Sequence, residues 1–394
     1  MSAGPLADKK DGATMNWVAW KMLNGDIAKY LGAVFGVAFG VLLITQQASI
    51  FIGLMSRTAN PLRDVREASV WVTDRHQQNA DEIEPISDGA VHRIRGVEGM
   101  DWAVRLYKGV ARARRPDGIF RQVILLGVDD HSFVGAPRTI LMGDLADLRR
   151  PSAVFIDKAG HESLWPGEPL RLGREIEMSE RRAVIVGICE TSAPFQSFPV
   201  VVATYSQATQ FIARERKQLS FVVGAPVAGV TPAEACRRIK AATGFEALTY
   251  DQFVWQTINY YIANTGIPVN FGITIVLGFI VGAAIAGQTF YLFTLENLRH
   301  FGALKAMGVN NRRLIGMVLL QAAVIGAIGY SLGVGMAVAF FEVSGRVLPD
   351  LRGMNIPWQV AFGTAGVVVA IITFASLMSL RRVLLLEPAV VFRG

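Results

Sequence analysis

One stretch of the sequence has the letters of a catalytic motif: Gly329, Ser331 and Gly333 match the G-x-S-x-G nucleophile elbow of hydrolases. In that motif the serine sits on a strand-to-helix turn and works with a histidine base. Here Ser331 lies in the middle of a long apolar run without a histidine, so hydrolase chemistry is not indicated. Gly326 extends the pattern to the small-residue spacing that lets membrane helices approach closely. We interpret Gly326, Gly329, Gly333 and Gly335 as a helix-packing face.

Patterns for binding phosphate or metal are also missing. A P-loop needs a Gly-Lys pair followed by Ser or Thr, and the chain contains no Gly-Lys dipeptide. The five histidines lack metal-ligand spacing; they are His76, His92, His131, His161 and His300. We therefore predict no catalytic residue, no metal site and no directly bound cofactor, and we expect no nucleic-acid partner.

The two cysteines leave two interpretations open. Cys189 and Cys236 both fall in the segment that we place outside the membrane, where an oxidising compartment would permit a disulfide. Cys189 ends an apolar strand and Cys236 lies in the first turn of a helix, so two separately buried thiols fit the sequence as well.

The composition is that of a membrane protein with a large polar insert. Hydrophobic residues make up 52% of the chain and charged residues 18%. Four stretches are free of Asp, Glu, Lys and Arg for longer than the roughly 20 residues that cross a hydrocarbon core; they are residues 30–56, 252–295, 314–341 and 354–380. The second is much longer than a bilayer requires, so we expect its first part, around Trp255 and Tyr261, to stand outside the membrane.

The predicted fold is membrane α-helical, with four transmembrane helices and a large periplasmic α+β domain between helices 1 and 2. Its segments are a cytoplasmic N-terminus (1–30), helix 1 (31–54), the periplasmic domain (55–266), helix 2 (267–295), a cytoplasmic elbow (296–313), helix 3 (314–341), a short periplasmic loop (342–355), helix 4 (356–380) and a cytoplasmic C-terminus (381–394).

Lysine and arginine set the predicted orientation, because short flanking segments rich in them stay cytoplasmic. Such residues lie before span one, between spans two and three, and after span four, so we predict a multi-pass protein of the bacterial inner membrane with both termini cytoplasmic. The N-terminus also carries apolar residues at helical spacing. Trp17, Trp20 and Ile27 lie on one face and Lys21 lies elsewhere, which predicts a helix on the membrane surface. For residues 1–13 a disordered tail remains an alternative.

The insert predicts one or two α+β subdomains, because short β-branched runs alternate with turns and helices. The expected strands are residues 68–73, 100–107, 121–128, 153–157, 170–178, 183–189, 200–204 and 220–223. Thr231 and Glu234 form a capping box that opens a helix to about Ala242. Two further helices are expected at residues 206–217 and 88–95.

A basic segment follows the second apolar run and resembles a known junction. The matching residues are Arg299, Phe301, Gly302, Leu304, Lys305, Ala306 and Gly308. They resemble the segment of FtsX/MacB-type (type VII) ABC transporter permeases in which Arg-Glu-Ile-Gly leads into Leu-Lys-Ala-x-Gly. His300 replaces the usual Glu. The C-terminal Glu387-Pro388-Ala389, the order of spans and the external segment at Gly127-Val128-Asp129 extend the resemblance to nearly the whole chain, and the external core resembles the DevC-like branch.

The resemblance implies a homodimer bound to two copies of a separate ABC ATP-binding subunit, which would hold the ATP and Mg²⁺. The expected contact with that subunit is a helix at residues 309–313 within the elbow; the coupling residues would be Glu296, Arg299, Gly302, Lys305, Gly308, Val309, Asn310, Asn311, Arg312 and Arg313. Simple membrane anchoring is the alternative role for Arg312 and Arg313.

The apolar stretches of the spans contain no ionisable residue. This favours helices that transmit movement over helices that line a polar pore. The predicted function is a non-catalytic permease subunit that moves its periplasmic domain and exports or extracts a lipid or other amphiphile, with a periplasmic adaptor (a membrane fusion protein) and an outer-membrane duct. The alternative is a non-transporting scaffold that activates a cell-wall hydrolase or signals to a sensor.

Overall fold

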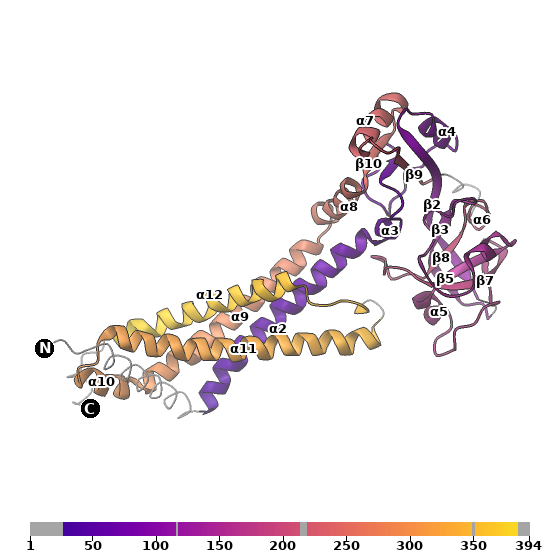
Figure 1. The fold of residues 1–394 in the computed structure, drawn as a ribbon. Helices are drawn as coiled ribbons and strands as arrows, with labels where there is room; N and C mark the ends of the chain where they lie inside the picture. The colour runs from indigo at the N-terminus through magenta and orange to yellow at the C-terminus, as the bar shows by residue number, and fades with distance from the viewer. Residues whose placement is uncertain (1–26, 116, 213–218, 349–350, 385–394) are drawn as a thin grey trace. The chain divides into compact units, whose positions relative to one another are not determined.

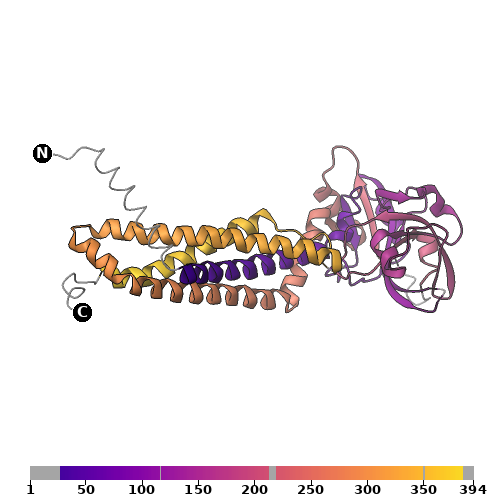
Figure 2. The ribbon, with the colours of Figure 1, turned by 90° about the horizontal axis from the view of Figure 1, so that it is seen from below.

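The computed structural model describes residues 27–115, 117–212, 219–348 and 351–384. The chain divides into two compact units, which we describe separately. The helical unit contains the residues up to Gly53 and from Gly266 onward, and the insert domain runs from Leu54 to Thr265. Figures 1 and 2 show the helices of the first unit and the strands of the second from two directions.

Four long helices in the described chain are long and apolar enough to cross a membrane, as the sequence predicted. They are α2 (Ile27–Thr58), α9 (Ile267–Glu296), α11 (Asn311–Val347) and α12 (Trp358–Leu384). A short helix, α10 (Leu298–Ala306), joins α9 to α11. At 1.5 Å per residue, the 37 residues of α11 exceed the roughly 30 Å of a hydrocarbon core, so this helix extends beyond the predicted span.

Glycines bring the helices of this unit close together. A Cβ placed on Gly329 would lie 2.7 Å from Val37 Cβ of α2, and one on Gly333 would lie 2.6 Å from the Ala38 carbonyl oxygen. A Cβ on Gly326 would lie 2.9 Å from Ile372 Cγ2 of α12. At these three positions, therefore, only a residue without a side chain allows the observed approach of α11 to its neighbours. The prediction is wrong for Gly335, because a Cβ placed there would meet no neighbouring helix within 4 Å.

The described part of the insert domain forms a sheet of ten strands. They are β1 (Val70–Thr73), β2 (Met100–Arg114), β3 (Phe120–Val128), β4 (Thr139–Met142), β5 (Ala153–Asp157), β6 (Glu175–Met178), β7 (Arg181–Glu190), β8 (Val200–Thr204), β9 (Phe221–Pro226) and β10 (Glu246–Thr249). All eight expected strands are present, and β4 and β10 are additional. The sheet order is β10-β1-β9-β2-β3-β8-β5-β7-β4, and β6 pairs with both β2 and β7.

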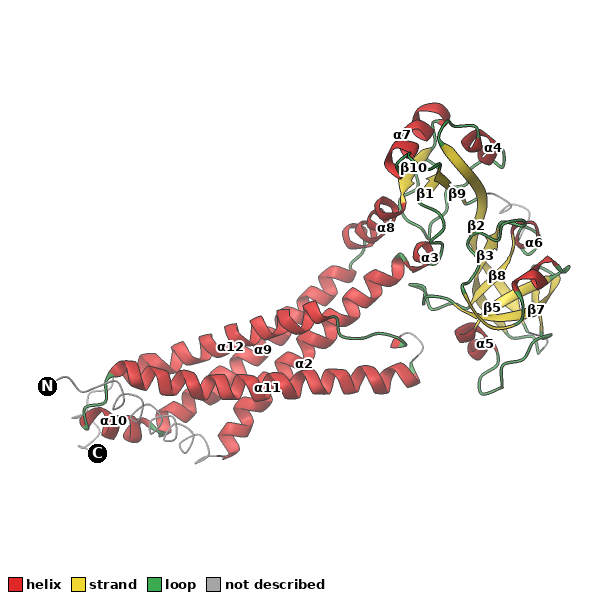
Figure 3. Ribbon diagram, in the orientation of Figure 1, coloured by secondary structure: helices red, strands yellow, loops and turns green. Residues whose placement is uncertain are grey.

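Strand β2 belongs to both halves of the domain (Figure 3). Its first half pairs with β9 from Met100 to Leu106, and its second half pairs with β3 from Tyr107 to Arg114. The pairs β2–β3, β3–β8, β8–β5, β5–β7, β7–β6 and β6–β2 close a ring. Strand β2 thus joins a half that is built from β10, β1 and β9 to a barrel-like half. The domain is therefore a pair of α+β lobes.

Some of the insert's helices begin at a residue whose side chain caps the first turn. The described helices of the insert are α3 (Asn60–Arg63), α4 (Ala90–Arg95), α5 (Lys158–Leu164), α6 (Tyr205–Ala208), α7 (Pro232–Thr243) and α8 (Tyr250–Asn264), with a 3-10 turn η1 (Leu145–Arg149). Thr231 caps α7 as expected, but the Glu234 carboxylate accepts hydrogen bonds from Arg237 and Arg238 instead of completing the capping box. A complete capping box opens α8, between Thr249 and Gln252.

The helix expected at residues 206–217 is wrong over the described part, because α6 ends at Ala208. Phe211 and Ile212 turn inward there and are 2% and 5% exposed, so tertiary burial overrides helix propensity. Residues 213–218 lie outside the described chain. Cys189 and Cys236 are both buried free thiols, in β7 and α7 respectively, so the domain follows the second interpretation.

Candidate coupling site

Helix α9 ends in polar residues, and the junction with α11 begins there. Glu296, its last residue, pairs with Lys29 of α2. Asn297 follows, and its side-chain amide donates a hydrogen bond of 2.9 Å to the Phe293 carbonyl oxygen. The first contact ties the end of α9 to α2, and the second closes the last turn of α9 before the chain turns into α10.

One aromatic side chain fixes α10 to the helical core. Phe301 is 1% exposed and belongs to the same apolar cluster as Phe290, Phe293 and Leu314. Gly302 beside it is also buried. Phe301 therefore packs this nine-residue helix into the same apolar cluster as the end of α9 and the start of α11.

A left-handed glycine makes the turn into α11. Gly308 has φ of +87°, and its N–H donates to the Lys305 carbonyl oxygen at 3.0 Å. Asn310 then caps α11, its side-chain oxygen accepting a hydrogen bond from the Arg312 N–H. The contact helix expected at residues 309–313 is therefore corrected. Val309 and Asn310 are in the turn, Asn311 begins α11, and the separate short helix of the elbow is α10, because Gly308 ends one helix before Asn310 starts the next.

The outer surface of this junction is basic around one apolar side chain. Met307 is 72% exposed. The other exposed side chains of the junction are Glu296, Arg299, His300, Asn310, Asn311, Arg312 and Arg313, whereas Lys305 is half-buried. Figure 1 shows α10 at one end of the helical unit. The structure thus brings the predicted coupling residues together on one short segment. Trp17, Trp20 and Lys21 lie outside the described residues, and Ile27 is the exposed first residue of α2.

The insert domain holds a second polar site, which sequence reasoning missed. Lys108 of β2 has a side chain that is only 7% exposed; its ammonium pairs with Asp81 and donates to the Ala80 carbonyl oxygen at 2.7 Å. Tyr261 of α8 donates its hydroxyl hydrogen to Asp81 Oδ2 at 2.7 Å. We call Asp81, Lys108 and Tyr261 the polar clamp. It connects α8 to the strand that both lobes share.

Further contacts support the clamp along α8. The Gln256 side-chain amide donates to the Gln77 carbonyl oxygen at 2.7 Å, and the Tyr261 ring lies 4.8 Å from the Phe195 ring, centroid to centroid. Burial, together with the Asp81 charge, raises the pKa of Tyr261 and keeps it a neutral donor. The paired tyrosines at 260 and 261, just before an apolar span, were the available sequence signal. Asp81, the partner of Tyr261, is too distant in the chain for spacing to reveal.

Family comparisons decide what kind of protein carries these two sites. Residues 272–388 match the family model described as FtsX-like permease C-terminal. Residues 31–242, more than half of the chain, match the MacB-like periplasmic core domain. The chain belongs to the FtsX/MacB permease family. The assignment to the DevC-like branch stays a prediction.

Relatives of this permease carry the same kind of name. A protein of Mycobacterium tuberculosis (strain H37Rv), described as an uncharacterized ABC transporter permease, is 27% identical over 226 residues, which are 57% of this chain and 58% of the relative. An uncharacterized ABC transporter permease of Mycobacterium bovis is 32% identical over 121 residues, which are 30% of this chain and 32% of the relative. The permease thus spans less than two thirds of the length of these relatives.

Solved structures with some similarity to the permease are external domains. The extracellular domain of the noncanonic ABC-type transporter YknZ from Gram-positive bacteria aligns with 46% of this chain and 98% of that domain, with 13% identity and a TM-score of 0.34. The periplasmic region of MacB from Actinobacillus actinomycetemcomitans aligns with 52% of this chain and 96% of that region, with 13% identity and a TM-score of 0.36.

The barrel-like lobe of the permease buries an aspartate and a histidine. Asp157 is 5% exposed and accepts hydrogen bonds from the N–H groups of Val200 (2.7 Å) and Gly160 (3.1 Å); burial nevertheless raises the pKa of its carboxyl to about 6. His161 is fully buried, and within the described residues neither ring nitrogen has a hydrogen-bond partner. Burial, followed by the nearby Arg174 charge, lowers the pKa of His161. Both groups face the interior of the domain, where they affect its stability.

Proposed function

We propose that this permease is the membrane subunit of an ABC transporter and passes the motion of a separate ATP-binding subunit to its insert domain. The observation that carries the proposal is the α10–α11 junction, where an exposed basic surface lies on a helix that Phe301 fixes to the core. Two ATP-binding subunits on a homodimer of the permease would hold the ATP and Mg²⁺. The permease itself would hold neither.

The surface chemistry of the junction supports docking of such a subunit. Met307 offers an apolar anchor, and Arg299 before it and Arg312 after it in the sequence carry exposed positive charge. An apolar pocket rimmed by carboxylates would complement this surface and would exclude basic partners. The same arrangement requires the junction, and therefore both termini, to face the cytoplasm.

The proposed path to the insert domain runs along α9 and α8. α8 ends at Asn264 and α9 begins at Ile267. The polar clamp fastens α8 to β2, so movement of α8 would be passed to the strand that both lobes share. A lever of this kind needs no polar path through the spans, and their charge-free stretches agree with that.

The proposed substrate is a lipid or another amphiphile, which can reach the insert domain sideways from the membrane. An adaptor and an outer-membrane duct would then carry it onward. Reconstitution of the complex in vesicles that contain a fluorescent lipid tests this part. ATP-dependent loss of the lipid from the vesicles supports export, whereas ATP turnover that never moves an amphiphile supports the non-transporting scaffold.

The coupling role is tested by two variants of the junction. Gly308→Pro cannot adopt the observed φ of +87° and removes the N–H that bonds to Lys305. The double variant Arg312→Glu/Arg313→Glu reverses the charge of the surface. Both should insert into membranes but lose co-purification with the cognate ATP-binding subunit, together with the ATPase stimulation that the complex shows.

The matched control is Arg121→Glu/Arg171→Glu, which changes the same charge on exposed residues of the insert domain. It should bind and stimulate the ATP-binding subunit like the wild type. Normal binding and stimulation by both junction variants would show that the junction only anchors the helices and that coupling occurs elsewhere.

A further inference from the structure

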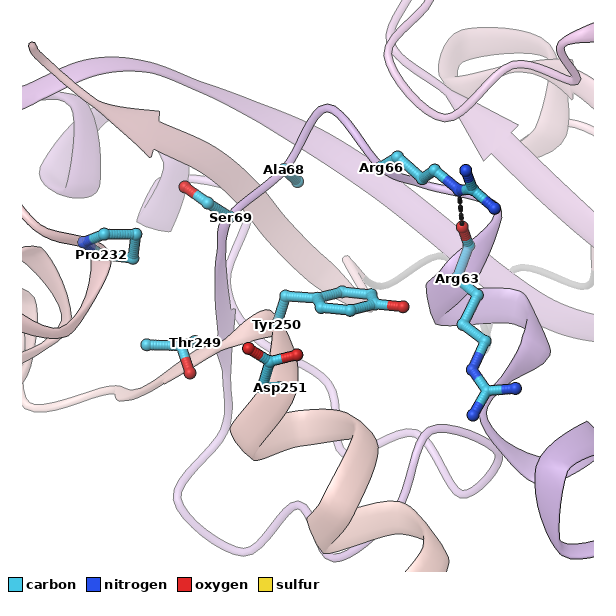
Figure 4. A pocket seen from close by; sticks show the side chains of 8 residues that line it. All are labelled: Arg63, Arg66, Ala68, Ser69, Pro232, Thr249, Tyr250 and Asp251. Carbon is cyan, nitrogen blue, oxygen red and sulfur yellow. Dashed lines mark hydrogen bonds between the residues drawn. The ribbon is translucent and has the colours of Figure 1, made fainter. Parts of the chain in front are cut away.

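A pocket of about 460 Å³ lies in the insert domain, between the segment that follows α2 and the start of α8 (Figure 4). It is lined by Arg63, Arg66, Ala68, Ser69, Pro232, Thr249, Tyr250 and Asp251. The volume is in the range of about 300–1,000 Å³ that small-molecule sites occupy. Figure 4 shows the Tyr250 side chain extending from α8 toward Arg63 and Arg66.

The two arginines of the pocket have only neutral partners among the described residues. The Arg63 guanidinium donates to Ser56 Oγ at 2.6 Å and to Asn60 Oδ1 at 3.5 Å. Arg66 donates to the Arg63 carbonyl oxygen at 3.4 Å. None of the described carboxylates forms an ion pair with either guanidinium. Two cations that line one pocket without a carboxylate partner attract an anion with several oxygen acceptors, and a phosphate group offers these in the geometry that suits Arg.

One carboxylate of the pocket is also without a cation. Asp251 lies in the first turn of α8, where the helix N-terminus stabilises its charge without a basic side chain. No ion pair of Asp251 occurs within the described chain. The pocket therefore offers two positive charges to an anion and one negative charge to a cation, and a ligand that carries both groups satisfies all three.

One arginine of the pocket is bonded to the last turn of α2, a candidate membrane span. Ser56, which accepts the hydrogen bond from Arg63, belongs to the last turn of α2, and the charge-free run of that helix ends at Ser56. A helix that leaves the hydrocarbon at this point has its last turn among the lipid headgroups. The ligand most available to a pocket at this depth is therefore a lipid headgroup.

We propose that this pocket binds a phosphate ester that carries a primary ammonium group, as in the phosphoethanolamine headgroup of a membrane lipid. Arg63 and Arg66 bind the phosphate oxygens, and Asp251 accepts hydrogen bonds from the ammonium. A quaternary choline ammonium has no N–H to donate, so the pocket selects ethanolamine over choline. Lipid binding by this pocket does not depend on the proposed transport function. Only the claim that the bound lipid is the transported substrate would rest on that function.

The experiment uses the full chain in nanodiscs that contain phosphatidylethanolamine, phosphatidylcholine and phosphatidylglycerol in equal amounts. Native mass spectrometry after release counts the lipids that stay bound, and calorimetric titration with glycerophosphoethanolamine measures the soluble headgroup. We expect the wild type to retain phosphatidylethanolamine preferentially. Arg63→Gln/Arg66→Gln should weaken binding at least about tenfold, because charge-assisted hydrogen bonds to phosphate are lost.

Asp251→Asn provides the second readout, because it should abolish the preference for ethanolamine over choline while phosphate binding persists. Arg121→Gln/Arg171→Gln removes equal charge elsewhere and should change neither result. Retention of phosphatidylethanolamine by the chain would show that the ligand is a membrane lipid. Binding of glycerophosphoethanolamine without any retained lipid would show that the ligand is a soluble ester with the same two groups. Equal retention of ethanolamine and choline lipids by the wild type, or unchanged binding by the double arginine variant, overturns the proposal. Neither readout involves ATP, so failure of the transport proposal is seen separately.

Discussion

The Tyr261 hydroxyl and the Asp81 carboxylate are 2.7 Å apart, and the same carboxylate pairs with the buried ammonium of Lys108. One acidic side chain in a loop thus joins the last helix of the insert domain to its central strand. The bond from Tyr261 has a charged acceptor in a half-buried setting, where hydrogen bonds contribute about 1.5–3 kcal/mol. Its loss should therefore be measurable both in stability and in coupling.

Tyr261→Phe should lower the free energy of unfolding of the insert domain by about 1.5–3 kcal/mol, because Asp81 loses a donor that water replaces incompletely. Denaturant unfolding of the detergent-solubilised chain measures this change. Tyr260→Phe is the matched control, since the neighbouring hydroxyl donates to Glu82 at 3.2 Å on the exposed side and should cost about 1 kcal/mol or less. Equal effects of the two variants would show that the clamp contributes no more than a surface contact.

Gly333→Ala should destabilise the helical unit by about 1–3 kcal/mol or more, because the new Cβ would lie 2.6 Å from the Ala38 carbonyl oxygen, which cannot rotate away. Thermal unfolding of the purified chain provides the measurement. Gly335→Ala changes the same helix two residues later, where no atom of the described structure lies within 4 Å. The control should keep or raise the melting temperature, and a matching fall in both variants would count against close packing at Gly333.

Asp157→Asn should change how stability depends on pH. Because the folded-state pKa is raised from 3.8 to about 6, the folded chain binds this proton more tightly than the unfolded chain. Stability contributed by the group is therefore complete below about pH 4 and is lost as the pH rises through 6, with a cost on the order of 3 kcal/mol. The variant keeps an oxygen acceptor for Val200 and Gly160. Denaturant unfolding from pH 4 to 7.5 should show a flatter profile than in wild type, and identical profiles would refute the prediction.

A cysteine at Arg171 should react with a membrane-impermeant thiol reagent in intact spheroplasts, whereas one at Asn310 should react only after the membrane is opened. Both positions are exposed, so accessibility depends on the side of the membrane alone. The native thiols give little background, because Cys189 is 0% and Cys236 3% exposed and burial raises the pKa of Cys236 to about 11. Labelling of Asn310→Cys from outside would reverse the proposed orientation.

Hydropathy and burial explain which elements the sequence could predict. The spans are apolar for longer than any soluble helix needs, and β5 and β8 are five-residue runs buried at every position, so their bounds were predicted to the residue. β4 has no buried residue and β10 has only four residues at the edge of the sheet, so neither stands out from a loop. Short edge strands depend on a partner strand, which local pattern does not identify.

The junction between α9 and α11 could be located in the sequence because its residues are consecutive and their charge contrasts with the spans. Its internal structure could not be predicted, because the division into α10 and α11 depends on the left-handed conformation of Gly308 and on the cap by Asn310. The polar clamp and the arginine pocket combine segments from opposite ends of the insert. Asp81 and Tyr261, like Arg63 and Asp251, meet only after the sheet has formed.

The pairing of β1 has a consequence for how the protein is made. Val70 pairs with Gly224 of β9 and with Thr249 of β10, so the first strand of the insert finds both neighbours only when the last strands have been synthesised. At about 5–20 residues per second, ribosomes need on the order of ten seconds or more to reach them. Throughout that interval Trp71 lacks Phe221 and Phe253, the rings that cover it in the finished fold. Until the last strands are made, the nascent chain therefore presents an apolar, unpaired strand edge, and such edges favour aggregation.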